Sequence, residues 1–201
     1  QDIARIERLV TEHDVKCLLV DSLVAACGGE AKDTAPPTAF YSCLRRLTGM
    51  STLIVAHTSK AEDRTKTVYG NVFFQNEAKS IWEIRKKQVE GSHTLEIALF
   101  HRKCNIDKHY NPMGYRIDFL DGAHTFKPID LATVDTFVPF LPQKRRILDC
   151  LKSGAKTVEE IAEASQVPFN TVSVRLSELK KAKMVINLSE NLWGLPTERE
   201  L

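Results

Sequence analysis

Two short apolar runs near the start of the chain each end in polar residues. Cys17–Val20 is followed by Asp21-Ser22, and Leu53–Ala56 is followed by His57-Thr58-Ser59-Lys60. Apolar runs of this length without alternation are typical of buried strands in parallel sheets. Apolar residues at helical spacing precede each run. The alternation of helix and strand therefore predicts a parallel α/β sheet.

Further along, the pattern changes to a period of two residues. Apolar and polar side chains alternate over 80–84, 94–100 and 116–119, and Asp121-Gly122 then gives a strong hairpin-turn signal. Consecutive strands joined by tight turns pair antiparallel. We therefore predict that residues 1–126 form one α/β domain, with a mostly parallel sheet and an antiparallel edge.

The remainder of the chain divides into a linker and a second domain. Residues 127–142 contain several prolines and no helical period, which predicts a linker whose Phe and Leu side chains pack back on the first domain. In 143–201, Thr157 and Glu160 form a capping-box pattern at the start of a second helix, and Asn170 begins a third. Three helices followed by a β-hairpin predict a winged helix containing a helix-turn-helix.

Composition narrows the possible partners and compartments. The chain has 28 basic and 26 acidic side chains, so any contact with nucleic acid must depend on local placement of charge. No apolar stretch approaches the roughly 20 residues of a membrane span. The five cysteines are scattered without C-x-x-C spacing, which favours reduced thiols in the cytoplasm.

The strand ends carry the candidate chemistry. Open parallel sheets bind ligands beyond the carboxyl ends of their strands. An acid such as Asp21 suits Mg²⁺ held through water, and the polar turn from His57 suits a terminal phosphate. The chain contains no G-x-x-x-x-G-K-[ST] motif. If the protein is a P-loop NTPase, its phosphate-cradling loop and catalytic Glu are expected upstream of Gln1.

Four segments in order carry a resemblance to a known family: Leu18–Leu23, Leu53–Lys60, Gly70–Trp82 and His101–Asn105. Together they resemble RecA-type ATPases, specifically the ring-forming DNA helicases of the RepA and DnaB type, over the C-terminal half of such a domain. The resemblance implies an ATP-hydrolysing enzyme with Mg²⁺, a homo-oligomeric ring of six subunits, DNA as partner, and no membrane association.

The resemblance also implies roles for single residues. Asp21 corresponds to the acid that positions magnesium, with Ser22 beside it, and His57 corresponds to the polar sensor. Lys79 stands where the family usually has an arginine finger. Lys103 and Asn105 stand where it has a Lys-x-Arg pair that reaches the neighbouring subunit's nucleotide, so Lys79 and Asn105 depart from the pattern. Lys60, Arg64 and Lys66 correspond to cations of the family's loop that faces DNA.

Each assignment has a structural alternative. Asp21 can simply end a strand, His57 can be a structural histidine, and Lys79 can be a solvated strand end. In the winged helix, we expect DNA contacts from Asn170, Thr171, Ser173, Arg175, Lys180 and Lys181, although such domains also dock proteins.

Two functions remain open from the sequence. One is an ATP-driven DNA helicase or loader in replication or recombination. The other is a non-enzymatic DNA-binding regulator whose degenerate ATPase half serves oligomerisation.

Overall fold

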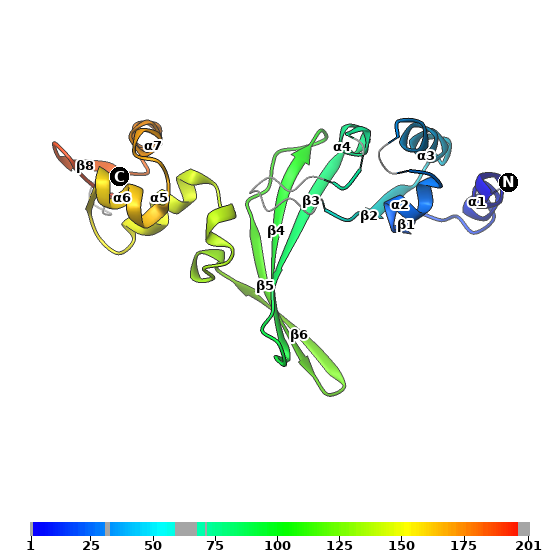
Figure 1. Ribbon diagram of the computed structural model, residues 1–201, viewed down its shortest axis with the longest axis horizontal. Coiled ribbons are helices and arrows are strands. Elements are labelled where there is room, and N and C mark those ends of the chain that lie inside the picture. The colour runs from blue at the N-terminus through cyan, green and yellow to red at the C-terminus, as the bar shows by residue number, and fades with distance from the viewer. Residues whose placement is uncertain (1, 31–32, 59–67, 71, 197–201) are drawn as a thin grey trace. The chain divides into compact units, whose positions relative to one another are not determined.

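The computed structural model describes residues 2–30, 33–58, 68–70 and 72–196 (Figure 1). The chain is mixed α/β, with a parallel two-stranded sheet, an antiparallel four-stranded sheet and a small three-stranded sheet. The elements in chain order are α1 (Asp2–Glu12), β1 (Cys17–Asp21), α2 (Leu23–Cys27), α3 (Ala35–Arg46), β2 (Ser51–Val55), α4 (Phe73–Glu77), β3 (Ser80–Lys87), β4 (Thr94–Cys104), β5 (Met113–Leu120), β6 (Ala123–Ile129), two 3₁₀ turns (Leu131–Thr133 and Val138–Phe140), α5 (Gln143–Leu151), β7 (Lys156–Thr157), α6 (Val158–Ser165), α7 (Phe169–Lys181), β8 (Ile186–Ser189) and β9 (Leu192–Gly194).

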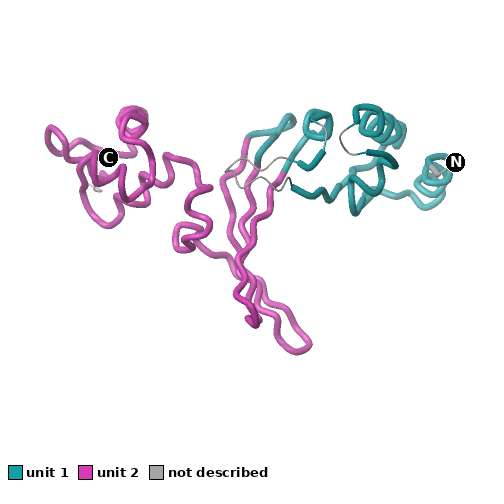
Figure 2. The backbone as a smooth tube through the Cα atoms, in the orientation of Figure 1, with its two compact units in different colours: residues 1–81, 102–108 teal, residues 82–101, 109–201 magenta. Residues whose placement is uncertain are grey.

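The chain forms two compact units, coloured separately in Figure 2. One contains residues 1–81 and 102–108, and the other contains residues 82–101 and 109–201. The division passes through β3 and β4. It does not coincide with the domain limits expected at residues 126 and 142, which stay a prediction.

The predicted parallel pairing of the first two strands is confirmed. β1 pairs with β2 in register from Cys17 opposite Ser51 to Asp21 opposite Val55. The predicted burial of both strands is wrong for one face, because Leu19 and Leu53 are 62% and 61% exposed. Ile54 packs with the core around α2 and α3, whereas the opposite face has no cover among the described residues. An apolar run indicates that a strand can be buried, and a second layer must be present to bury it.

The later strands form a separate antiparallel sheet in the order β3-β4-β5-β6, rather than the edge of one continuous sheet. The Asp121-Gly122 turn is confirmed, with Leu120 pairing with Ala123 and Gly122 at a φ of 74°. Side chains from the predicted linker cover one end of this sheet. Buried residues of both segments make up this core: Ala98, Phe100, Leu131, Val134, Phe137 and Leu141. Residues 131–141 of the predicted linker thus pack against β4, whereas residues 127–129 belong to β6.

The three helices α5, α6 and α7 enclose a closed apolar core with the strands β8 and β9 at its edge. Ile147, Ile161 and Leu176 are fully buried there. Thr157 caps α6 by accepting a hydrogen bond from the Glu160 N–H, and the Glu160 carboxylate accepts one from the Thr157 N–H at 2.7 Å. The predicted capping box is therefore confirmed.

Candidate functional site

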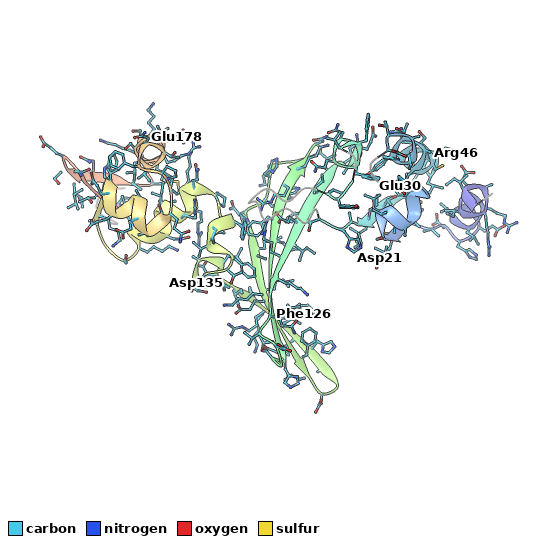
Figure 3. The ribbon with its side chains drawn as sticks, viewed as in Figure 1. Asp21, Glu30, Arg46, Phe126, Asp135 and Glu178 are labelled. Carbon is cyan, nitrogen blue, oxygen red and sulfur yellow. The ribbon has the colours of Figure 1, made fainter. Side chains whose placement is uncertain are left out.

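The carboxyl ends of β1 and β2 lie at one edge of the parallel sheet. Asp21 is the last residue of β1 and pairs with Val55, the last residue of β2, so His57 follows only two residues beyond that pair. Asp21 (Figure 3) and His57 are both exposed. The parallel register thus brings the predicted acid and the predicted sensor to the same edge, where such sheets bind ligands.

The residues after each strand hold this edge in place. Ser22 precedes α2 as its N-cap residue, and its hydroxyl makes no capping hydrogen bond. The carbonyl of His57 accepts a hydrogen bond from the Tyr69 N–H at 2.8 Å, and Thr58 bridges Val68. Tyr69 is 43% exposed. Sequence reasoning missed Tyr69 because only the folded chain brings residues 68–69 back beside the end of β2.

A buried tyrosine supports the edge from below. Leu23, Tyr41 and Phe74 form the core that joins α2, α3 and α4. The Tyr41 hydroxyl donates a hydrogen bond to the Phe74 carbonyl at 3.1 Å, and burial raises the pKa of Tyr41 to about 12. The neutral phenol therefore fixes α4 against α3.

The structure brings the three other predicted catalytic residues together near α4. The Asn105 N–H donates to the Lys79 carbonyl at 2.9 Å. The Lys103 ammonium donates to the carbonyls of Gln75 and Asn76, at 2.8 Å each. Because these carbonyls belong to the last turn of α4, Lys103 acts here as a helix C-cap.

Lys79 differs from Lys103 in its surroundings. Its side chain is exposed, and within the described ranges its ammonium has no hydrogen-bond or ion-pair partner. In the same ranges, no hydrogen bond or ion pair joins Asp21 or His57 to Lys79, Lys103 or Asn105. The structure therefore holds two separate groups of predicted residues. Lys60, Arg64 and Lys66 lie outside the described residues.

In the three-helix unit, formed by α5, α6 and α7, α7 presents an exposed stripe of polar side chains beside the exposed Phe169 and Val174. Asn170, Ser173, Ser177 and Lys181 follow one another at helical spacing and are exposed, whereas Thr171 is half-buried. Small side chains on such a stripe allow the helix backbone to approach another surface closely.

Arg175, one of the residues expected to contact DNA, is held within this unit. Arg175 donates to Gln143 at 3.2 Å and to both oxygens of Glu178, at 3.0 and 3.1 Å. Glu178, labelled in Figure 3, also pairs with Lys144 at 3.0 Å. Hydrogen bonds from Lys144 and then Arg175 lower the pKa of Glu178. Arg175 is therefore engaged in hydrogen bonds within this unit.

The two predicted phosphate-binding lysines of α7 also differ. The Lys180 ammonium lies 5.9 Å from the centre of the Trp193 ring, where the cation is attracted to the aromatic face. Lys181 is exposed on the stripe. Lys181 is therefore the better placed of the two to meet a phosphate.

The donor set is consistent with magnesium held by one carboxylate. Among the described residues, no three His, Cys, Asp or Glu side chains gather as a metal site. Mg²⁺ usually keeps several waters and binds through one or two carboxylates plus substrate phosphates. Asp21 at an exposed strand end fits that mode. Across the same residues, no helix has both the length and the apolar character needed to cross a bilayer.

Comparison of the chain with protein-family models and with curated proteins gave no match. The assignment of function therefore rests on the residues and their geometry.

Proposed function

We propose that the protein is a RecA-like, ATP-hydrolysing DNA-binding protein, a helicase or loader in replication or recombination, that works in the cytoplasm as a ring of subunits, with six as the expected number. The observation that carries the proposal is the parallel register of β1 and β2, which sets Asp21 and His57 at one exposed edge. An acid and a polar side chain on neighbouring strand ends suit the binding of Mg²⁺ and of a terminal phosphate.

In this proposal each residue at the edge has one task. Asp21 would hold Mg²⁺ through water, and the ion would neutralise charge on the ATP phosphates. His57 would contact the terminal phosphate, and the hydrogen bond between its carbonyl and the Tyr69 N–H would connect that contact to Tyr69.

The negative charge on the transferring phosphoryl group must be stabilised by a cation that comes from outside the sheet edge carrying Asp21 and His57. Lys79 is the better candidate for a finger from the neighbouring subunit, because its ammonium is exposed, whereas that of Lys103 caps α4. Lysine is a point charge and cannot make the bidentate contact of arginine. We therefore expect a weaker finger than those of arginine-bearing relatives.

The three-helix unit supplies duplex binding as a winged helix. α6 and α7 act as a helix-turn-helix, with the exposed stripe of α7 in the major groove and Lys181 near the phosphates. The capped, closed core keeps the spacing of the two helices constant. Lys60, Arg64 and Lys66 are proposed to contact DNA from the ATPase half.

The test uses the protein expressed from its complete gene. Asp21→Asn should abolish magnesium-dependent ATP hydrolysis while ATP binding without magnesium is nearly unchanged, because only the interaction with the metal is removed. The matched control is Asp33→Asn, which neutralises another exposed acid of the same unit. Full hydrolysis by Asp21→Asn, or equal loss in both variants, contradicts the proposal.

A second function is favoured by the state of Lys103. If neither lysine reaches a nucleotide, the chain is a DNA-binding regulator whose ATPase half only oligomerises. This alternative predicts that the protein from the complete gene binds DNA and assembles, yet hydrolyses no ATP.

A further inference from the structure

An aromatic cluster on β3 and β4 lies outside both groups of residues described above. Trp82 stacks on His101, with ring centres 4.3 Å apart and planes 6° from parallel. Tyr110 completes the cluster, 6.0 Å from Trp82 and 5.6 Å from His101. Trp82 and His101 lie on β3 and β4, and Tyr110, from the segment between β4 and β5, packs beside them.

One face of the Trp82 indole is left open by this arrangement. The His101 and Tyr110 rings are only 5.6 Å apart, so both lie on the same side of Trp82 or at its edge. If they lay on opposite faces, they would be nearly twice as far from each other. Trp82 is 36% exposed and Tyr110 is 48% exposed. Among the described rings, none stacks on the second face of Trp82.

The cluster is held in place by hydrogen bonds as well as by stacking. The Tyr110 N–H donates to Nδ1 of His101 at 3.1 Å. Nδ1 of His109 lies 3.3 Å from the His101 carbonyl. Next to His101 in sequence, Phe100 is buried in the core beneath the sheet and fixes β4. A ligand that stacks on Trp82 therefore meets a surface that is already ordered.

The acidic side chains of this sheet all lie on one of its two faces. Neighbouring side chains on a strand point to opposite faces. The carboxylates of strands β3 to β6, namely Glu83, Glu96 and Asp118, all lie on the face opposite Trp82, as their ion pairs with Arg85, Arg116 and Lys127 indicate.

The face of Trp82 instead carries a cation. Lys86 is exposed and lies four residues along β3 on the same side, about 13 Å away at the rise of a strand. An open aromatic face with a cation and no strand carboxylate is complementary to a flat ring joined to phosphate.

We propose that Trp82, backed by His101 and Tyr110, is a stacking platform for a base of single-stranded nucleic acid, with Lys86 contacting a phosphate of the same strand. Aromatic platforms bind single strands without strong sequence preference, because every base has a stacking face. The site acts without ATP and without duplex binding by α7, so it does not depend on the function proposed above.

The test follows the fluorescence of Trp82 as oligothymidylate is added without ATP. The chain has two tryptophans, so Trp193→Phe leaves Trp82 as the only reporter. Binding should quench it. In the otherwise native chain, Trp82→Ala should weaken binding of labelled oligothymidylate roughly 5- to 150-fold, the range expected for loss of one stacked base. Trp82→Phe should keep most of the affinity.

Two further variants distinguish binding at Trp82 from non-specific binding elsewhere on the protein. Phe126→Ala removes another aromatic side chain, which is 66% exposed and belongs to no ring pair among the described residues, and should leave affinity unchanged. Lys86→Ala should lower the salt dependence by about 0.7 in the slope of log K against log salt.

The proposal fails if Trp82 is not quenched, or if Phe126→Ala weakens binding as much as Trp82→Ala. It also fails if matched duplex binds Trp82 as tightly as the single strand. Far-UV circular dichroism of Trp82→Ala checks folding. The quenching result does not depend on that variant.

Discussion

The three-helix unit and the β1–β2 sheet treat their apolar side chains in opposite ways. In the helical unit, Ile147, Val172 and Leu176 are fully buried. In the parallel sheet, Leu19, Leu53 and Val55 are 62%, 61% and 43% exposed. Amphipathic helices bring their own covering faces, whereas a parallel strand depends on further layers. The comparison teaches that the helical unit buries its apolar residues in a closed core, whereas the proposed chemistry lies beside a sheet with one exposed apolar face.

The largest expected effect comes from Leu176, in the core of the helical unit. Leu176→Ala should lower the free energy of unfolding by about 2–5 kcal/mol, because it leaves a cavity in a closed core. Leu53→Ala is the matched control and should change it by less than about 0.5 kcal/mol, as is usual at a surface. Urea titrations followed by circular dichroism measure both. Equal losses would show that the Leu53 face is covered in solution.

The next effect concerns the start of α6. Thr157→Ala removes the side-chain half of the capping box and should cost about 1 kcal/mol of unfolding free energy. Ser173→Ala, on the exposed surface of α7, should cost much less. Chemical denaturation of both variants provides the comparison. A Thr157→Ala protein as stable as wild type would show that the Thr157 cap does not stabilise the fold.

An effect of similar size on the free energy of unfolding is expected for Tyr41, in the unit that contains the β1–β2 sheet. Tyr41→Phe should lower stability by about 1 kcal/mol, since the Phe74 carbonyl loses its hydrogen-bond donor. The folded pKa of Tyr41, about 12, lies above its ordinary value of 10.0. Its contribution is therefore complete below pH 10 and is lost as the pH rises through 12. Unfolding measured across alkaline pH should show this loss in wild type, and a profile identical in Tyr41→Phe would refute it.

The smallest effect concerns DNA and Arg175. Glu178→Gln removes the carboxylate that holds Arg175 and Lys144. Duplex affinity should rise, with the salt slope steeper by about 0.9 for each additional phosphate that the released cations neutralise. Because the pKa of Glu178 is lowered in the folded protein, its ion pairs stabilise at neutral pH and are lost as the pH falls through that pKa.

Binding titrations at several salt concentrations compare wild type with Glu178→Gln. The control is Glu163→Gln, on α6. Unchanged affinity in Glu178→Gln would mean that Arg175 takes no part in binding.

Local patterns determined much of the fold. The capping box at Thr157 and the turn at Asp121-Gly122 could be predicted because each depends on neighbours within a few residues. The parallel pairing of β1 with β2 followed from the helix between them. Burial of Leu19 and Leu53 could not be predicted, because it depends on which other layers are present.

The candidate site was predictable in its residue types and not in its contacts. Asp21 and His57 share an edge because strand register determines it. The hydrogen bonds of Lys103 with α4, and of Arg175 with Glu178 and Gln143, join residues whose proximity is set only by packing. The stacking of Trp82 on His101 likewise requires β3 and β4 to be aligned.

The central claim is that ATP binds at the edge of the sheet that carries Asp21, and that Lys79 of a neighbouring subunit completes this site. The most direct measurement mixes two inactive variants of the protein from the complete gene, Asp21→Asn and Lys79→Ala. Arginine fingers raise kcat by a factor of about 10³–10⁵. A lysine finger should contribute less than this, but its loss in Lys79→Ala should still strongly lower kcat. Lys103→Ala should instead mainly loosen α4 and lower stability.

The account predicts that mixed rings recover part of the wild-type rate of ATP hydrolysis, because some interfaces then combine an intact Asp21 with an intact Lys79. Mixtures no more active than the separate variants would contradict it.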